Sequence, residues 1–189
     1  YYSKATEGKY AYDPAKAKQL LAESKFDTSY VLKVMVPTGN KVRELSADVV
    51  QANLQDIGVK MSIEKMEFAT LRTKQKEDTW DLSFIGWGGS LDPDVSSQFK
   101  TGGQYNNGGW SLKAMDDLLD KGVATADTAE RKKIYNDFQN LFVEELPIIP
   151  LYWANRTVAV NKRVMGAKHM IGTFNLNRNI HEWWVTDGK

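Results

Sequence analysis

The fold is decided by residues 81–94, which read DLSFIGWGGSLDPD. Trp80, Leu82 and Phe84 alternate with polar residues, a pattern typical of a strand whose two faces differ. The strand then stops at three glycines around Trp87, and glycine lets a backbone bend sharply or approach a ligand closely. Pro93, between Asp92 and Asp94, restricts the backbone where the chain leaves this loop. A large ring framed by glycines and carboxylates indicates a small-molecule or peptide pocket. The same residues also suit an ordinary strand-to-loop turn whose tryptophan caps the core.

Strand and helix patterns alternate before this stretch. Apolar residues at period two predict strands, and apolar residues at helical spacing predict helices, in the order 30–36, 41–57, 59–63 and 68–76. Gly58 is placed to end the first of these helices. The alternation predicts an α/β fold, a mixed sheet with flanking helices and some parallel pairing. Ligands of such sheets gather beyond the carboxyl ends of the strands, where residues 86–94 lie, and this favours the pocket over the turn.

Other local signals predict helices on both sides of this series. Asp13 and Pro14 suit the N-cap and the first position of one helix. Ser111 suits the N-cap of a second helix, and Asp127 with Glu130 resembles a capping box that opens a third. An irregular C-terminal segment follows two short predicted strands, at 148–153 and 156–160.

The composition excludes several classes of function. Of the 189 residues, 42% are hydrophobic and 26% are charged, as in an ordinary globular domain. The formal net charge is +1, so the overall charge does not indicate binding to nucleic acid or to an anionic membrane. The sequence holds no apolar run of about 18 residues that would span a bilayer. The absence of cysteine excludes disulfides, cysteine-ligated metal and thiol catalysis.

Catalytic patterns are poor. Ser90 lacks the glycine two residues on that a nucleophile elbow requires, and no glycine-rich phosphate loop is present. The two histidines have no spacing partner for a zinc site. A hydrolase would have to use Asp92 and Asp94, yet an Asp-Pro-Asp sequence more often forms a turn. The basic run 131–133 is most simply a solvated helix face. We therefore expect no enzyme activity, no cofactor and no metal.

Four patterns, in this order, resemble the bacterial family 5 extracellular solute-binding proteins, which are the peptide, dipeptide and nickel receptors of ABC importers. They are YDPAKAKQLL at 12–21, LQDIGV at 54–59 running into MSI at 61–63, WDL with GWG and DPD within 80–94, and LPIIPLY at 146–152. Between the last two, NGGWS at 107–111 with LL at 118–119 resembles a further family segment. The match covers nearly the whole chain, and the ordered set is specific.

The resemblance implies one lobe of a class II, periplasmic-binding-protein-like fold. In such receptors two lobes close on a ligand by hinge motion, without covalent chemistry. It implies that residues 1–155 are the second, C-terminal lobe without its opening helix. Residues 156–189 correspond to a tail that returns to the first lobe in full-length relatives. Since no first lobe is present here, we expect this tail to be irregular, swapped or packed on a neighbouring chain, with self-association through the missing-lobe surface.

The resemblance also implies a ligand and a location. The ligand would be an oligopeptide held between the lobes, the partner an ABC permease, and the site of action extracytoplasmic, either periplasmic or on a cell-surface lipoprotein. Peptide-binding relatives often carry an aspartate three residues after the loop tryptophan, where this chain has Ser90. A neutral hydroxyl cannot make the charge-assisted bond to a ligand ammonium. Asp92 or Asp94 would then substitute, or the peptide is longer and held by its backbone, or the solute is not a peptide, such as a nickel chelate or an opine.

The residues expected to bind ligand lie on the loop after the third strand or are aromatic residues near its mouth and the hinge: Gly86, Trp87, Gly88, Gly89, Ser90, Asp92, Asp94, Trp110, Tyr152 and Trp153. Core packing is the alternative for the last three of these aromatic residues. Because half of the cleft is missing, we expect this chain alone to bind weakly. A second alternative is a protein-interaction module that offers an aromatic surface near Trp183 and Trp184.

Overall fold

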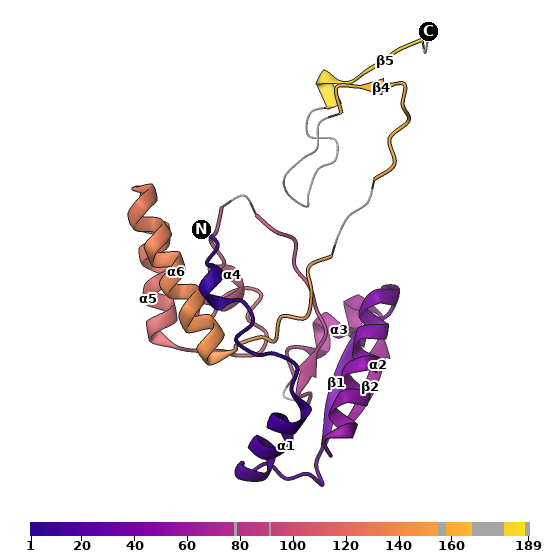
Figure 1. Ribbon diagram of the computed structural model, residues 1–189, viewed down its shortest axis with the longest axis vertical. Helices are drawn as coiled ribbons and strands as arrows, with labels where there is room; N and C mark the ends of the chain where they lie inside the picture. The colour runs from indigo at the N-terminus through magenta and orange to yellow at the C-terminus, as the bar shows by residue number, and fades with distance from the viewer. Residues whose placement is uncertain (78, 91, 155–157, 168–179, 188–189) are drawn as a thin grey trace. The chain divides into compact units, whose positions relative to one another are not determined.

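The computed structural model describes residues 1–189 except 78, 91, 155–157, 168–179 and 188–189 (Figure 1). The chain forms two compact units. The α/β unit comprises residues 6–86 and 104–110, and the helical unit comprises residues 1–5, 87–103 and 111–189.

The α/β unit is built on a parallel sheet of three strands. These are β1 (Val31–Pro37), β2 (Lys60–Met66) and β3 (Leu82–Ser83), in the order β2-β1-β3. Val34 of the central strand pairs with Ile63 of β2 and with Leu82 of β3. The structure thus confirms the α/β class and the parallel pairing.

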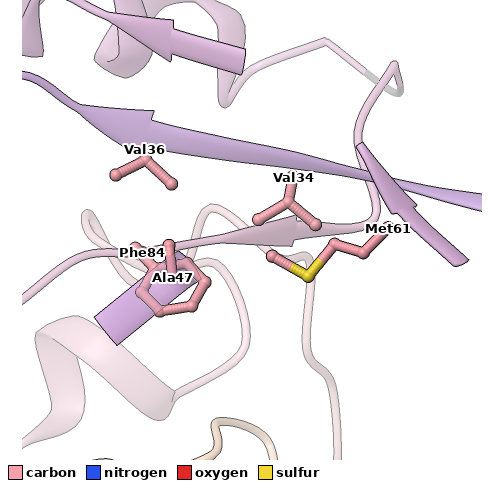
Figure 2. Close-up of a cluster of buried hydrophobic side chains, with 5 residues drawn as sticks. All are labelled: Val34, Val36, Ala47, Met61 and Phe84. Atoms are coloured by element: carbon pink, nitrogen blue, oxygen red, sulfur yellow. The ribbon is translucent and has the colours of Figure 1, made fainter. Parts of the chain in front are cut away.

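Helix α2 (Lys41–Asp56) covers one face of this sheet (Figure 1). Asn40 starts it, because its side chain accepts a hydrogen bond from the Arg43 N–H at 3.1 Å. Gly58 ends it as predicted, at φ +90°, with its N–H on the Gln55 carbonyl in a Schellman arrangement. Beneath the helix lies a core, shown in Figure 2, to which β1, β2, α2 and the residue after β3 contribute: Val34, Val36, Ala47, Met61 and Phe84.

The opposite face of the sheet carries the short helix α3 (Phe68–Lys74). Met35 and Met66 point to this face, because side chains alternate along a strand, and they pack with the fully buried Leu71 and with Trp80. The remaining helix of this unit, α1 (Pro14–Glu23), begins as predicted, with the Asp13 carboxylate accepting the Lys16 N–H at 2.9 Å.

The helical unit contains α4 (Ser96–Phe99), α5 (Lys113–Ala124) and α6 (Thr128–Glu145), of which α5 and α6 pack together. The predicted cap of α6 is confirmed: the Asp127 carboxylate accepts the Glu130 N–H at 2.8 Å. Two 3-10 turns, η1 (Lys4–Thr6) and η2 (Ile180–Glu182), and one antiparallel pair, β4 (Val164–Met165) with β5 (Trp184–Val185), are also described.

Three local predictions differ from the structure. Helix α5 begins one residue later than expected, after Leu112, because the Ser111 hydroxyl is paired with that of Thr101 at 3.0 Å and caps nothing. Residues 148–153 form no strand, and Pro150 within this range lacks the N–H group that a ladder needs. The strand expected at 156–160 lies partly outside the described residues, and residues 158–160 are not in a strand.

Candidate ligand-binding loop

The candidate loop begins where the sheet ends. The Phe84 N–H donates to the Met35 carbonyl at 2.9 Å, which extends the pairing one residue beyond β3. At Gly86 an ideal Cβ atom would lie 3.2 Å from Nη2 of Arg43, so a side chain there would crowd the guanidinium. Gly86 belongs to the α/β unit and Trp87 to the helical unit. The glycine is therefore the last residue of the sheet side, and the loop proper starts at the tryptophan.

Trp87 is half-buried against an aromatic cluster of the helical unit. Its ring meets that of Phe99 edge-on, with centroids 6.1 Å apart and planes at 70°. Phe99 in turn packs edge-on against Phe142 of α6, with centroids 4.9 Å apart. The indole is thus held by an aromatic neighbour and keeps part of its surface accessible, which suits a ring that stacks on a ligand. Gly88, Gly89 and Ser90, which follow it, are all exposed.

Both candidate carboxylates have partners within the chain. Asp92 receives two hydrogen bonds from Arg131, Nη1 to Oδ2 and Nη2 to Oδ1, each 2.9 Å long. Its Oδ1 also accepts the Asp94 N–H at 2.9 Å. Arg131 is the main reason that the pKa of Asp92 lies below its ordinary value of 3.8. Asp94 accepts from the Ser96 N–H at 2.9 Å and from the Ser96 hydroxyl, in the turn that precedes α4. The two aspartates therefore shape the turn.

Sequence reasoning missed Arg131, which lies in the basic run assigned to a solvated face. Its side chain is only 17% exposed. Nε donates to the Gly122 carbonyl at 2.7 Å, and the guanidinium lies over the rings of Tyr1 and Tyr135, 5.6 and 5.3 Å from their centroids. The one signal in the sequence is the tyrosine one helical turn later, which distinguishes this cation from the lysines beside it.

The remaining candidates are aromatic residues outside the loop. Trp110, in the α/β unit, is half-buried, and its backbone N–H donates to Oδ1 of Asn106 at 3.0 Å. Tyr152 and Trp153, in the helical unit, are 47% and 88% exposed. The exposure of these last two residues speaks against core packing for them.

Other kinds of site find little support in the described residues. A hollow of about 120 Å³ lies on the sheet of the α/β unit, lined among others by Lys33, Glu64 and Trp80, and no predicted ligand-binding residue borders it. Throughout the described ranges no group of three histidine, aspartate or glutamate side chains is placed to hold a metal. No described helix has both the length and the apolar character to cross a bilayer.

Comparison with known proteins identifies the family. Residues 1–110 match the family described as bacterial extracellular solute-binding proteins, family 5 Middle. The chain belongs to the bacterial extracellular solute-binding proteins, family 5. This membership confirms the resemblance expected from the four sequence patterns.

Curated family 5 relatives are much longer than this chain. The oligopeptide-binding protein AppA of Bacillus subtilis is 31% identical over 94% of the chain and 35% of AppA. The peptide transport periplasmic protein SapA of Haemophilus influenzae is 29% identical over 86% of the chain and 30% of SapA. The chain therefore spans about a third of the length of these relatives.

Solved structures of family 5 proteins share the fold. The structure of B. subtilis AppA in complex with a nonapeptide matches with a TM-score of 0.77 and 26% identity, over 93% of this chain and 38% of AppA. The structure of AgaA from A. tumefaciens in complex with agropinic acid matches with a TM-score of 0.79 and 26% identity, over 100% of this chain and 40% of AgaA. Both likenesses agree with the expected periplasmic-binding-protein fold.

Proposed function

We propose that this chain is most of the second lobe of a two-lobed receptor that binds an oligopeptide and delivers it to an ABC importer. Residues 1–155 form the lobe, and residues 156–189 are the tail that returns to the first lobe. The observation that carries the proposal is the likeness to AppA, a peptide-binding structure, over 93% of the chain. The receptor works by closing on its ligand, and it performs no covalent chemistry.

Trp87 is the central ligand contact in this proposal. The edge-on contact with Phe99 holds its ring, and stacking on a ligand uses the accessible part of the indole. The exposed backbone at Gly86 and at Gly88–Ser90 offers hydrogen bonds to an extended peptide. Tyr152 and Trp153 supply further aromatic surface. Asp92 and Asp94 contribute by fixing the turn, because their carboxylates have partners within the chain.

The charge of the loop favours a peptide that is held along its backbone. Ser90 is neutral, and Asp92 is paired with Arg131. The described part of the loop therefore offers a ligand ammonium no carboxylate that is both charged and unpartnered. Such a loop suits a longer peptide, of the length seen bound to AppA. A longer extended peptide can gain affinity from many hydrogen bonds along its backbone.

An opine is the second candidate ligand. The likeness to AgaA covers the whole chain, and that structure holds agropinic acid. Because the described carboxylates of the loop, Asp92 and Asp94, are partnered, the loop also suits a solute without a terminal ammonium. In both cases the partner is an ABC permease and the location is extracytoplasmic, as the names of the periplasmic relatives support.

Calorimetric titration tests the proposal. The intact receptor should bind nonapeptides of mixed sequence, whereas the 189-residue chain alone should bind them at least about 100-fold more weakly, because closure draws on contacts to both lobes. Trp87→Ala should abolish binding, and Trp80→Phe, which alters a tryptophan packed against Met35 and Leu71 in the α/β unit, serves as the control. Binding of agropinic acid in place of peptide would select the second candidate. Sub-micromolar peptide binding by the isolated chain would refute the two-lobe requirement.

A further inference from the structure

All three guanidinium nitrogens of Arg131 donate hydrogen bonds within the helical unit. Nη1 and Nη2 hold the two oxygens of Asp92, and Nε holds the Gly122 carbonyl near the end of α5. The rings of Tyr1 and Tyr135, themselves edge-on at 5.7 Å, lie against the cation. Because each of the three nitrogens is bonded, the planar guanidinium is held in one orientation, unlike a lysine ammonium on a flexible stem.

The partner of this fork lies on the candidate loop, 39 residues away in sequence. Asp92 is bound to Arg131 on one side, and on the other it accepts the Asp94 N–H. Its own N–H donates to the Ser90 hydroxyl at 3.2 Å. Two of these links lie within the turn, and only the one to Arg131 ties the turn to a long helix. The opposite end of the loop is held by Trp87 on Phe99, so the glycines lie between two fixed points.

We propose that Arg131 is a positioning residue, which clamps Asp92 and thereby fixes the segment Trp87–Ser90 in the conformation that meets the ligand. This inference rests on the proposed function, because it assigns Arg131 to the same binding loop. Arg131 does not itself touch ligand in this account. It acts through Asp92, and a lysine at 131 cannot replace it, because one ammonium cannot make two parallel bonds to a carboxylate.

The first test needs no ligand and uses hydrogen exchange of the 189-residue chain. Arg131→Gln should raise exchange at residues 87–94 by about 10-fold or more, and Asp92→Asn should do the same. Asp92→Asn leaves Arg131 bound to Gly122 and stacked on the tyrosines, so it isolates the clamp from the packing of α5 on α6. Lys132→Gln, with the same change of charge one position along the helix, should exchange like wild type. Wild-type exchange of the loop in Arg131→Gln and Asp92→Asn would overturn the proposal.

The second test measures peptide affinity in the intact receptor. Arg131→Gln and Arg131→Lys should each weaken binding of a nonapeptide by about 10-fold. In an Asp92→Asn background, Arg131→Gln should have no further effect, because its whole influence passes through Asp92. A purely structural arginine would instead weaken binding equally in both backgrounds, and that result would overturn the proposal. If the wild-type receptor bound no peptide, the proposed function would fail, while the exchange experiment would still decide the role of the clamp.

Discussion

Replacement of Phe99 by leucine separates the support of Trp87 from general packing. Phe99 makes edge-on contacts with Trp87 and Phe142 and a tilted contact with Phe138 at 6.4 Å. An aromatic pair contributes about 0.5–1.5 kcal/mol beyond its buried area. Loss of the two edge-on pairs should therefore lower the free energy of unfolding of the helical unit by about 1–3 kcal/mol. Leucine fills much of the same volume, so the cavity term is small.

Loss of the contact between Phe99 and Trp87 should also weaken ligand binding, because Trp87 is the proposed ligand contact. One pair at about 0.5–1.5 kcal/mol corresponds to a weakening of about 2- to 13-fold in Kd. Phe142→Leu is the matched control, because Phe142 contacts Phe99 and Phe138, and no direct ring contact with Trp87 is found among the described residues. Urea unfolding of the chain should show similar losses for both variants, and calorimetry of the intact receptor should show weakened binding only for Phe99→Leu. Equal affinities for the two variants would refute the reasoning.

Three further predictions concern stability, each measured by urea unfolding. Gly58→Ala should cost about 1–2 kcal/mol, because φ is +90° there although the space is open; a neutral effect would contradict the Schellman cap. Gly122→Ala places a Cβ 2.8 Å from Cζ of Tyr135, so overpacking of about 1–3 kcal/mol should outweigh a helix gain of about 1 kcal/mol, and net stabilisation would contradict it. The lowered pKa of Asp92 means that its stabilising effect is present above its ordinary value of 3.8 and is lost as pH falls through the lower folded value. The difference between wild type and Asp92→Asn should therefore shrink from about pH 6 to about pH 3, and a constant difference would exclude the ion pair as its cause.

Local signals in the sequence were sufficient for much of the fold. The caps at Asp13 and Asp127 and the left-handed glycine at 58 each depend on residues within one or two helical turns, and all three lie where the sequence places them. The apolar alternation around residues 31–37 and 60–66 likewise predicted the strands. Ser111 failed as a cap because its hydroxyl pairs with Thr101, ten residues away, which no local pattern encodes.

The candidate site was predictable only in part, for the same reason. The glycines and the half-buried Trp87 follow from the end of a strand, a local feature. The clamp of Asp92 by Arg131 joins residues that are 39 positions apart, and its arginine is hidden in a run of three basic residues. The support of Trp87 by Phe99 depends on the four-residue helix α4, which was too short to show a helical period. Long-range partners of this kind need the folded chain.

The contact between Trp87 and the solute can be measured directly by fluorine NMR. The intact receptor would be labelled with 5-fluorotryptophan, and the Trp87 signal would be assigned by its loss in Trp87→Phe. We predict that this signal shifts in proportion to bound nonapeptide, while that of Trp80, packed in the core with Met35 and Leu71, stays in place. A Trp87 signal that does not move while calorimetry records saturating peptide binding would contradict the account.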